Sequence, residues 1–63
     1  MISEREEEVL KLTADGLSCK EIGERLFISE ATVKRHKSNV IRRLGAENMI
    51  NAVAIALREG MIK

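Results

Sequence analysis

Apolar residues recur along this chain at intervals of three and four, the spacing that gathers side chains on one face of a helix. Serine, asparagine and glycine residues interrupt the pattern at three places, where they can cap or end helices. The pattern therefore predicts four helices joined by short turns, at about 4–14, 19–26, 30–44 and 49–59. The expected fold class is all-α, a small four-helix domain.

The longest predicted helix, 30–44, follows Ser29, which can cap its start, and precedes Gly45, which can end it. Its 15 residues include no glycine or proline and would span about 22 Å. Val33 and Val40 lie on its apolar stripe, which we assign to the core. The opposite face holds small residues and cations: Ala31, Lys34, Arg35, Ser38 and Arg42. A grooved polyanion could approach that face closely, so the pattern is typical of a DNA-recognition helix.

Two serines are each followed three residues later by a glutamate, Ser3 by Glu6 and Ser18 by Glu21. Each pair predicts a capping box at a helix start. We interpret the glutamates of the first turn as a solvated surface rather than as a metal or catalytic site. Gly23, in the middle of the second helix, is tolerable where another helix crosses closely. Two capped helices joined by a short turn predict a helix-turn-helix over about residues 19–38.

Charge is distributed unevenly along the chain, although the net charge is only +1. Residues 1–29 carry four cations against seven anions, and residues 46–63 are neutral. Residues 30–45 carry five cations against one anion, a net charge of +4. The positive charge therefore lies on the predicted recognition helix, which favours a nucleic-acid partner.

Composition excludes several classes of function. The 63 residues form one small domain, 1–63, without a signal-peptide pattern or the roughly 20 apolar residues of a membrane span. The lone Cys19 forms no disulfide and fits a reducing cytoplasm. His36 has no accompanying nucleophile–base pair or ligand cluster. We therefore expect no enzyme, no metal, no other cofactor and no small-molecule substrate.

Three segments match the motifs of a known family: Ile2-Ser3-x-Arg5-Glu6-x-Glu8-Val9-Leu10, Gly16-Leu17-Ser18-x-Lys20-Glu21-Ile22 and Leu26-x-Ile28-Ser29-x-x-Thr32-Val33-Lys34-x-His36. Together they resemble the LuxR/GerE-type (NarL/FixJ-type) helix-turn-helix DNA-binding domain of bacterial transcription regulators. The resemblance covers nearly the whole chain. It implies that helix 30–44 enters the major groove and that the last helix pairs two copies. In the family a receiver or ligand-binding domain usually precedes such a domain.

The resemblance also implies roles for individual residues. Those that it assigns to base edges are Lys34, Arg35, Ser38 and Ala31. Those that it assigns to phosphates are Lys20, Thr32 and Lys37.

Two apolar rows run along the last predicted helix. We assign the row of Met49, Ala52, Val53 and Ala56 to the core. We assign the other row to a weak symmetric homodimer contact, made by Ile50, Ala54, Leu57 and, as a fourth candidate, Met61. Two copies would then bind an imperfect palindrome with half-sites about 10 bp apart. RNA polymerase is a further candidate partner.

A helical protein–protein interaction module without DNA binding is the alternative interpretation. It would also have amphipathic helices and an apolar last helix, but it would not need the basic face of helix 30–44. Retention on nonspecific DNA that weakens steeply with salt would distinguish the two. We expect a sequence-specific DNA-binding domain of a cytoplasmic bacterial regulator, either the effector domain of a response regulator or a free-standing protein.

Overall fold

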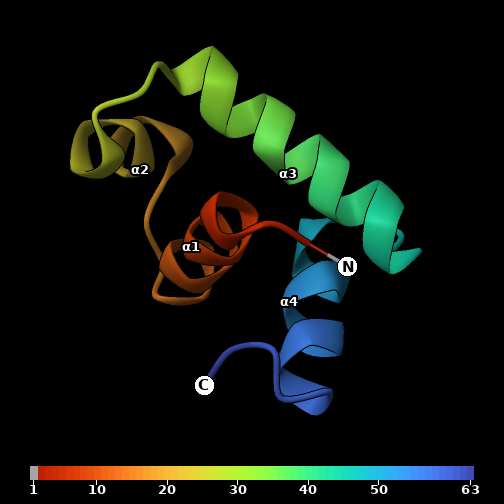
Figure 1. The fold of residues 1–63 in the computed structure, drawn as a ribbon. Coiled ribbons are helices and arrows are strands. Elements are labelled where there is room, and N and C mark those ends of the chain that lie inside the picture. Colours follow the sequence, from red (N-terminus) through yellow and green to blue (C-terminus); the bar gives the residue numbers. More distant parts are fainter. Residues whose placement is uncertain (1) are drawn as a thin grey trace.

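The computed structural model describes residues 2–63, which contain four helices and no strand (Figure 1). The helices are α1 (Glu4–Ala14), α2 (Cys19–Leu26), α3 (Glu30–Leu44) and α4 (Met49–Arg58). This confirms the all-α prediction, with one boundary wrong: α4 ends one residue earlier than expected. Figure 1 shows α3 as the longest element, with α2 near its beginning and α4 near its end. α1 lies between them and contacts all three other helices.

Each helix begins at a polar residue in extended conformation, whose side chain accepts a hydrogen bond from a backbone N–H of the first turn. These residues are Ser3, Ser18, Ser29 and Asn48. The capping boxes at Ser3 and Ser18 are both formed, with the glutamate three residues on accepting from the serine N–H. The helix starts are therefore set by local hydrogen bonds, which explains why the sequence pattern located them.

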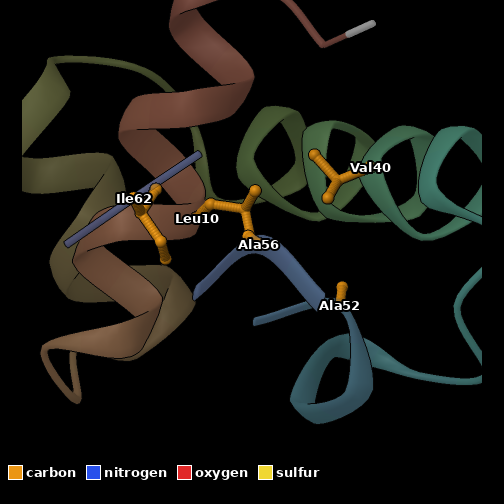
Figure 2. Packing of buried hydrophobic residues seen from close by; sticks show 5 residues of the cluster. All are labelled: Leu10, Val40, Ala52, Ala56 and Ile62. Atoms are coloured by element: carbon orange, nitrogen blue, oxygen red, sulfur yellow. The ribbon is translucent and has the colours of Figure 1, made fainter. Parts of the chain in front are cut away.

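Buried side chains form two clusters, one toward α4 and one toward α2. The α4 cluster consists of Leu10, Val40, Ala52, Ala56 and Ile62 (Figure 2). The α2 cluster consists of Val9, Ile22 and Val33. α1 and α3 each supply one residue to the α2 cluster and one to the α4 cluster. Within residues 2–63, α2 and α4 make no contact with each other. The α1–α3 pair therefore separates the two clusters.

The chain turns back toward the core after α4. Gly60 adopts a left-handed conformation with φ of 75°, and Ile62 then lies in the α4 cluster with 5% of its surface exposed. Met61, half-buried, packs against the same cluster. Met61 thus lies outside the α4 helix and differs in burial from the rest of its predicted row. Ile62 is a core residue that the helical periodicity did not reveal, because it lies beyond the last helix.

The connection between α2 and α3 approaches α2 very closely. A Cβ atom on Gly23 would lie 2.7 Å from the carbonyl oxygen of Ile28, so only glycine fits there. The close approach predicted at Gly23 is present, and the atoms that approach it belong to the backbone of the turn and of the first residue of α3.

Phe27 ends α2 in a left-handed conformation with φ of 60°. Its side chain is 94% exposed.

Candidate nucleic-acid interface

α3 carries the candidate site on the side turned away from the core. Val33 and Val40 are fully buried, as the stripe assignment requires. The residues of the opposite face are all exposed: Ala31, Lys34, Arg35, Ser38 and Arg42. The predicted base-edge residues therefore share one solvent-facing surface, which we call the α3 face.

The cations of α3 differ in what they contact. Lys34 Nζ lies 3.7 Å from Glu30 Oε2 on the surface, an exposed pair that contributes little to stability. Arg42 donates to the Asn39 side-chain oxygen at 2.9 Å. Within residues 2–63, no carboxylate lies within ion-pair distance of Arg35 or Lys37. Their full charge is therefore available to an anion brought to α3.

Arg43 contacts the core side of the molecule instead. Its Nη1 lies 3.0 Å from Glu6 Oε1, and Glu6 is only 3% exposed. The same oxygen accepts the Ser3 N–H at 2.9 Å. Glu6 is therefore not part of a solvated surface, as the sequence interpretation had it, but a buried acid that joins the start of α1 to the end of α3. The net charge of residues 30–45 overstates what α3 offers to a polyanion, because Arg43 is partly neutralised by Glu6.

Two hydroxyl groups meet at the start of α3. Ser29 Oγ accepts the Thr32 N–H at 3.0 Å and lies 2.8 Å from Thr32 Oγ1. One of the two hydroxyls donates to the other, so the second retains its proton for an outside acceptor. A phosphate oxygen is such an acceptor, and it would also meet the positive end of the helix dipole.

A hollow of about 310 Å³ lies beside these hydroxyls on the α3 face, lined by Ala31, Thr32 and Arg35. It brings together two predicted base-edge residues and one predicted phosphate residue. Ala31 contributes only a methyl group, and Arg35 contributes both an aliphatic stem and a guanidinium.

The other two predicted phosphate residues lie apart from this hollow. Lys20 is exposed in the first turn of α2. Lys37 is half-buried and lines a separate hollow of about 270 Å³ with Thr13, Ala14, Met49, Ile50 and Val53. Lys37 thus lies where α1, α3 and the first turn of α4 meet.

The predicted pairing row of α4 has its helical members on the surface. Ile50 is 84% exposed and Leu57 48% exposed, and Ala54 between them is exposed as well. Ala52 and Ala56 are fully buried. The row assigned to the core therefore includes buried residues, and the helical members of the row assigned to pairing are exposed.

The α2 capping box perturbs one carboxyl group. The Ser18 N–H and, after it, the Ser18 hydroxyl hold the pKa of Glu21 below its ordinary value, and Arg25 adds to the effect. The ionised form of Glu21 is therefore the one that supports the start of α2.

Sequence reasoning missed two features near this surface. Phe27, the only aromatic residue of the chain, lies almost fully exposed two residues before the Ser29 cap. No local signal predicts that exposure, although a count of aromatic residues singles Phe27 out. The Glu6–Arg43 pair joins residues 37 positions apart, beyond the reach of any short motif.

No group of three or more His, Cys, Asp or Glu side chains in residues 2–63 could hold a metal ion. No helix in this range is both long and apolar enough to cross a membrane.

Comparison with known proteins agrees with this geometry. Residues 1–56 match the family described as bacterial regulatory proteins, luxR family. The chain belongs to the luxR family. It is a family of DNA-binding transcription regulators and not of enzymes. The resemblance seen in the sequence motifs is therefore confirmed.

Relatives of this luxR-family chain include longer regulators. It is 41% identical over all 63 residues to the transcriptional regulatory protein DegU of Brevibacillus brevis, of which it covers 27%. Among solved structures, that of the transcription factor GerE superposes with a TM-score of 0.95 at 37% identity, covering 98% of this chain and 92% of that one. The structure of the response regulator ChrA of a heme-sensing two-component system superposes with a TM-score of 0.92 at 39% sequence identity. The match covers 98% of this chain and 31% of that one. The chain thus spans less than a third of the curated relatives that it matches.

Proposed function

We propose that this chain binds double-stranded DNA in a sequence-specific manner, as the effector domain of a bacterial response regulator or as a free-standing regulator, with α3 in the major groove. The observation that carries the proposal is the α3 face. It combines small residues, which allow close approach, with cations, of which Arg35 has no carboxylate partner within residues 2–63. Behind the α3 face, α3 packs against α1, α2 and α4. A basic helix held in this way can both dock on phosphates and read base edges.

The candidate residues divide into those that would contact base edges and those that would contact phosphates. Lys34, Arg35 and Ser38 occupy the α3 face, where base edges would lie, and Ala31 is close enough to touch them. Thr32 and Ser29 together retain one hydroxyl proton for a phosphate at the start of α3. Lys20, exposed in the first turn of α2, and Lys37 of α3 would supply the remaining contacts to the DNA backbone.

Two alanine substitutions test this division. Lys34→Ala should lower affinity for the preferred sequence by about 1–3 kcal/mol and relax preference at particular base pairs. Lys37→Ala should weaken all sequences alike and lower the slope of log affinity against log salt by about 1. The measurement is fluorescence anisotropy on selected and random duplexes at several salt concentrations.

The two variants serve as controls for each other, since each removes one lysine from the same helix. Equal loss of specific and random binding in Lys34→Ala would contradict its assignment to a base edge. A chain that retained no affinity for any duplex, even at low salt, would instead support a protein–protein interaction module.

We also propose that α4 pairs two copies on DNA. Ile50, Ala54 and Leu57 form a short exposed apolar row, too small for a stable dimer of standard interface size. Adjacent half-sites about 10 bp apart would raise the effective concentration of the second copy. Such a complex would work in the bacterial cytoplasm, with RNA polymerase as a candidate partner.

A further inference from the structure

The hollow on the α3 face lacks a complete set of polar groups. Ala31 offers a methyl group and can neither donate nor accept a hydrogen bond. The Thr32 hydroxyl is already bonded to Ser29 Oγ, and the proton that this pair retains suits a phosphate at the helix start. The guanidinium of Arg35 is the one charged group of the hollow, and within residues 2–63 it has no carboxylate partner.

The chemistry of DNA limits what can lie against the Ala31 methyl group beside a guanidinium. In the major groove, the edges of the base pairs present donors and acceptors, and thymine alone among the four bases adds an apolar group, its 5-methyl. A methyl group against Ala31 loses no hydrogen bond and leaves no buried polar atom unpaired. An amino group against the Ala31 methyl would lose its water without gaining a partner, whereas an N7 or O6 acceptor would pair with the Arg35 guanidinium instead of lying against Ala31.

We propose that this hollow receives the 5-methyl group of a thymine, so that Ala31 selects a T·A pair beside the base pair that Arg35 contacts. The inference rests on the proposed function and refines it, because it names one base of the half-site. Ala31 is thereby a specificity-determining residue through its small size. A longer side chain at this position would occupy the place of the methyl group and exclude it.

The test uses duplexes selected by the wild-type chain from a random pool. In the selected half-site, each thymine is replaced in turn by deoxyuridine, which removes the methyl group and leaves the hydrogen-bonding groups in place. At one thymine, deoxyuridine should lower wild-type affinity about three- to fivefold, the effect of removing one buried methyl group. At the remaining thymines the same replacement is the matched control and should change affinity less than about twofold.

Two variants connect the effect to Ala31. Ala31→Gly removes the methyl contact, so the thymine and deoxyuridine duplexes should bind with equal affinity. Ala31→Val adds two methyl groups where the thymine methyl would lie, so the deoxyuridine duplex should now bind as well as or better than the thymine duplex. Circular dichroism on both variants identifies any loss of helix, and Ala31→Val retains a side chain if the glycine weakens the first turn of α3.

Three results separate the outcomes. Indifference of the wild type to deoxyuridine at every thymine would overturn the inference while leaving the proposed function intact. A deoxyuridine penalty that persists unchanged in Ala31→Gly and Ala31→Val would also overturn it, because the methyl group would then contact another residue. Failure of the wild type to enrich any sequence from the pool would instead contradict the proposed function itself.

Discussion

Gly23 shows how a single missing methyl group can fix the geometry of a turn. In an exposed helix interior, alanine is more favourable than glycine by about 1 kcal/mol, so a bare propensity argument favours replacing Gly23. The Ile28 carbonyl oxygen lies where the alanine Cβ would have to be, at 2.7 Å. Because that oxygen belongs to the backbone, relief requires moving the turn itself.

Gly23→Ala should therefore destabilise the chain, and the cost of overpacking, about 1–3 kcal/mol, should outweigh the gain in helix propensity. Urea unfolding followed by circular dichroism measures the effect. Glu24→Ala is the matched control, since it changes an exposed residue of the same helix and should alter stability by less than about 0.5 kcal/mol. An increase in stability for Gly23→Ala would show that the turn can move at no cost.

Phe27 marks the limit of prediction at the scale of one residue. The left-handed conformation at a helix end is most often occupied by glycine or asparagine, and an aromatic residue there gives no signal for it. The prediction at Gly23 succeeded because a helix-turn-helix imposes a steric demand at that place. Phe27 lies in the same tight turn and adopts the left-handed conformation that this turn requires, but its residue type does not indicate it.

At the scale of the element, the Ser29 cap sets the position of α3. Ser29→Ala removes the acceptor of the Thr32 N–H and should cost about 1 kcal/mol of unfolding free energy, within a range of about 0.5–2. Thermal unfolding measures the loss. Ser38→Ala, which changes an exposed serine of the same helix that caps nothing, is the control. A stability of Ser29→Ala equal to that of the control would remove the capping role and leave a phosphate contact as the function of Ser29.

The α2 cap should make stability depend on pH. Because the folded chain lowers the pKa of Glu21 from its ordinary value of 4.5, the ionised form stabilises the fold above that unfolded value. That contribution is lost as the pH falls through the lower folded pKa. Glu21→Gln keeps a capping box but cannot titrate. The stability difference between wild type and Glu21→Gln should therefore shrink as the pH falls below about 4. Urea unfolding at a series of pH values measures it, and an unchanged difference would contradict it.

Element boundaries were predictable to within one residue because caps are local signals, as at Ser18 and Asn48. Contacts between elements were less accessible. The periodicity of α3 identified which residues face the core, but nothing near Arg43 indicated that it would reach Glu6 across 37 residues. Helical periodicity likewise assigned Ala52 to the core, but it could not predict the burial of Ile62, which joins the same cluster from outside a helix.

At the scale of the whole molecule, the exposed row of α4 predicts cooperative binding. Leu57→Glu should abolish cooperativity on paired half-sites and leave single-site affinity nearly unchanged, because Leu57 is 48% exposed and far from full burial. Leu57→Ala removes apolar area without adding charge and should cause a smaller loss. Binding isotherms on duplexes with one and two half-sites measure both effects. Retained cooperativity in Leu57→Glu would show that α4 does not pair the subunits, and unfolding of this variant would show that Leu57 belongs to the core.

The division of the core into an α4 cluster and an α2 cluster has a consequence for local unfolding. α4 and the segment around Ile62 are held by one cluster, and α2 by the other, and α2 and α4 do not touch within residues 2–63. A fluctuation that detaches α4 and the Ile62 segment removes no member of the cluster formed by Val9, Ile22 and Val33. Backbone amides of α4 can then exchange with solvent through a partial opening that the amides of the α2–α3 unit do not share. Substitutions in the half of the molecule that would pair subunits therefore reach the helix that would read DNA through the α4 cluster, to which α1 and α3 contribute the buried Leu10 and Val40.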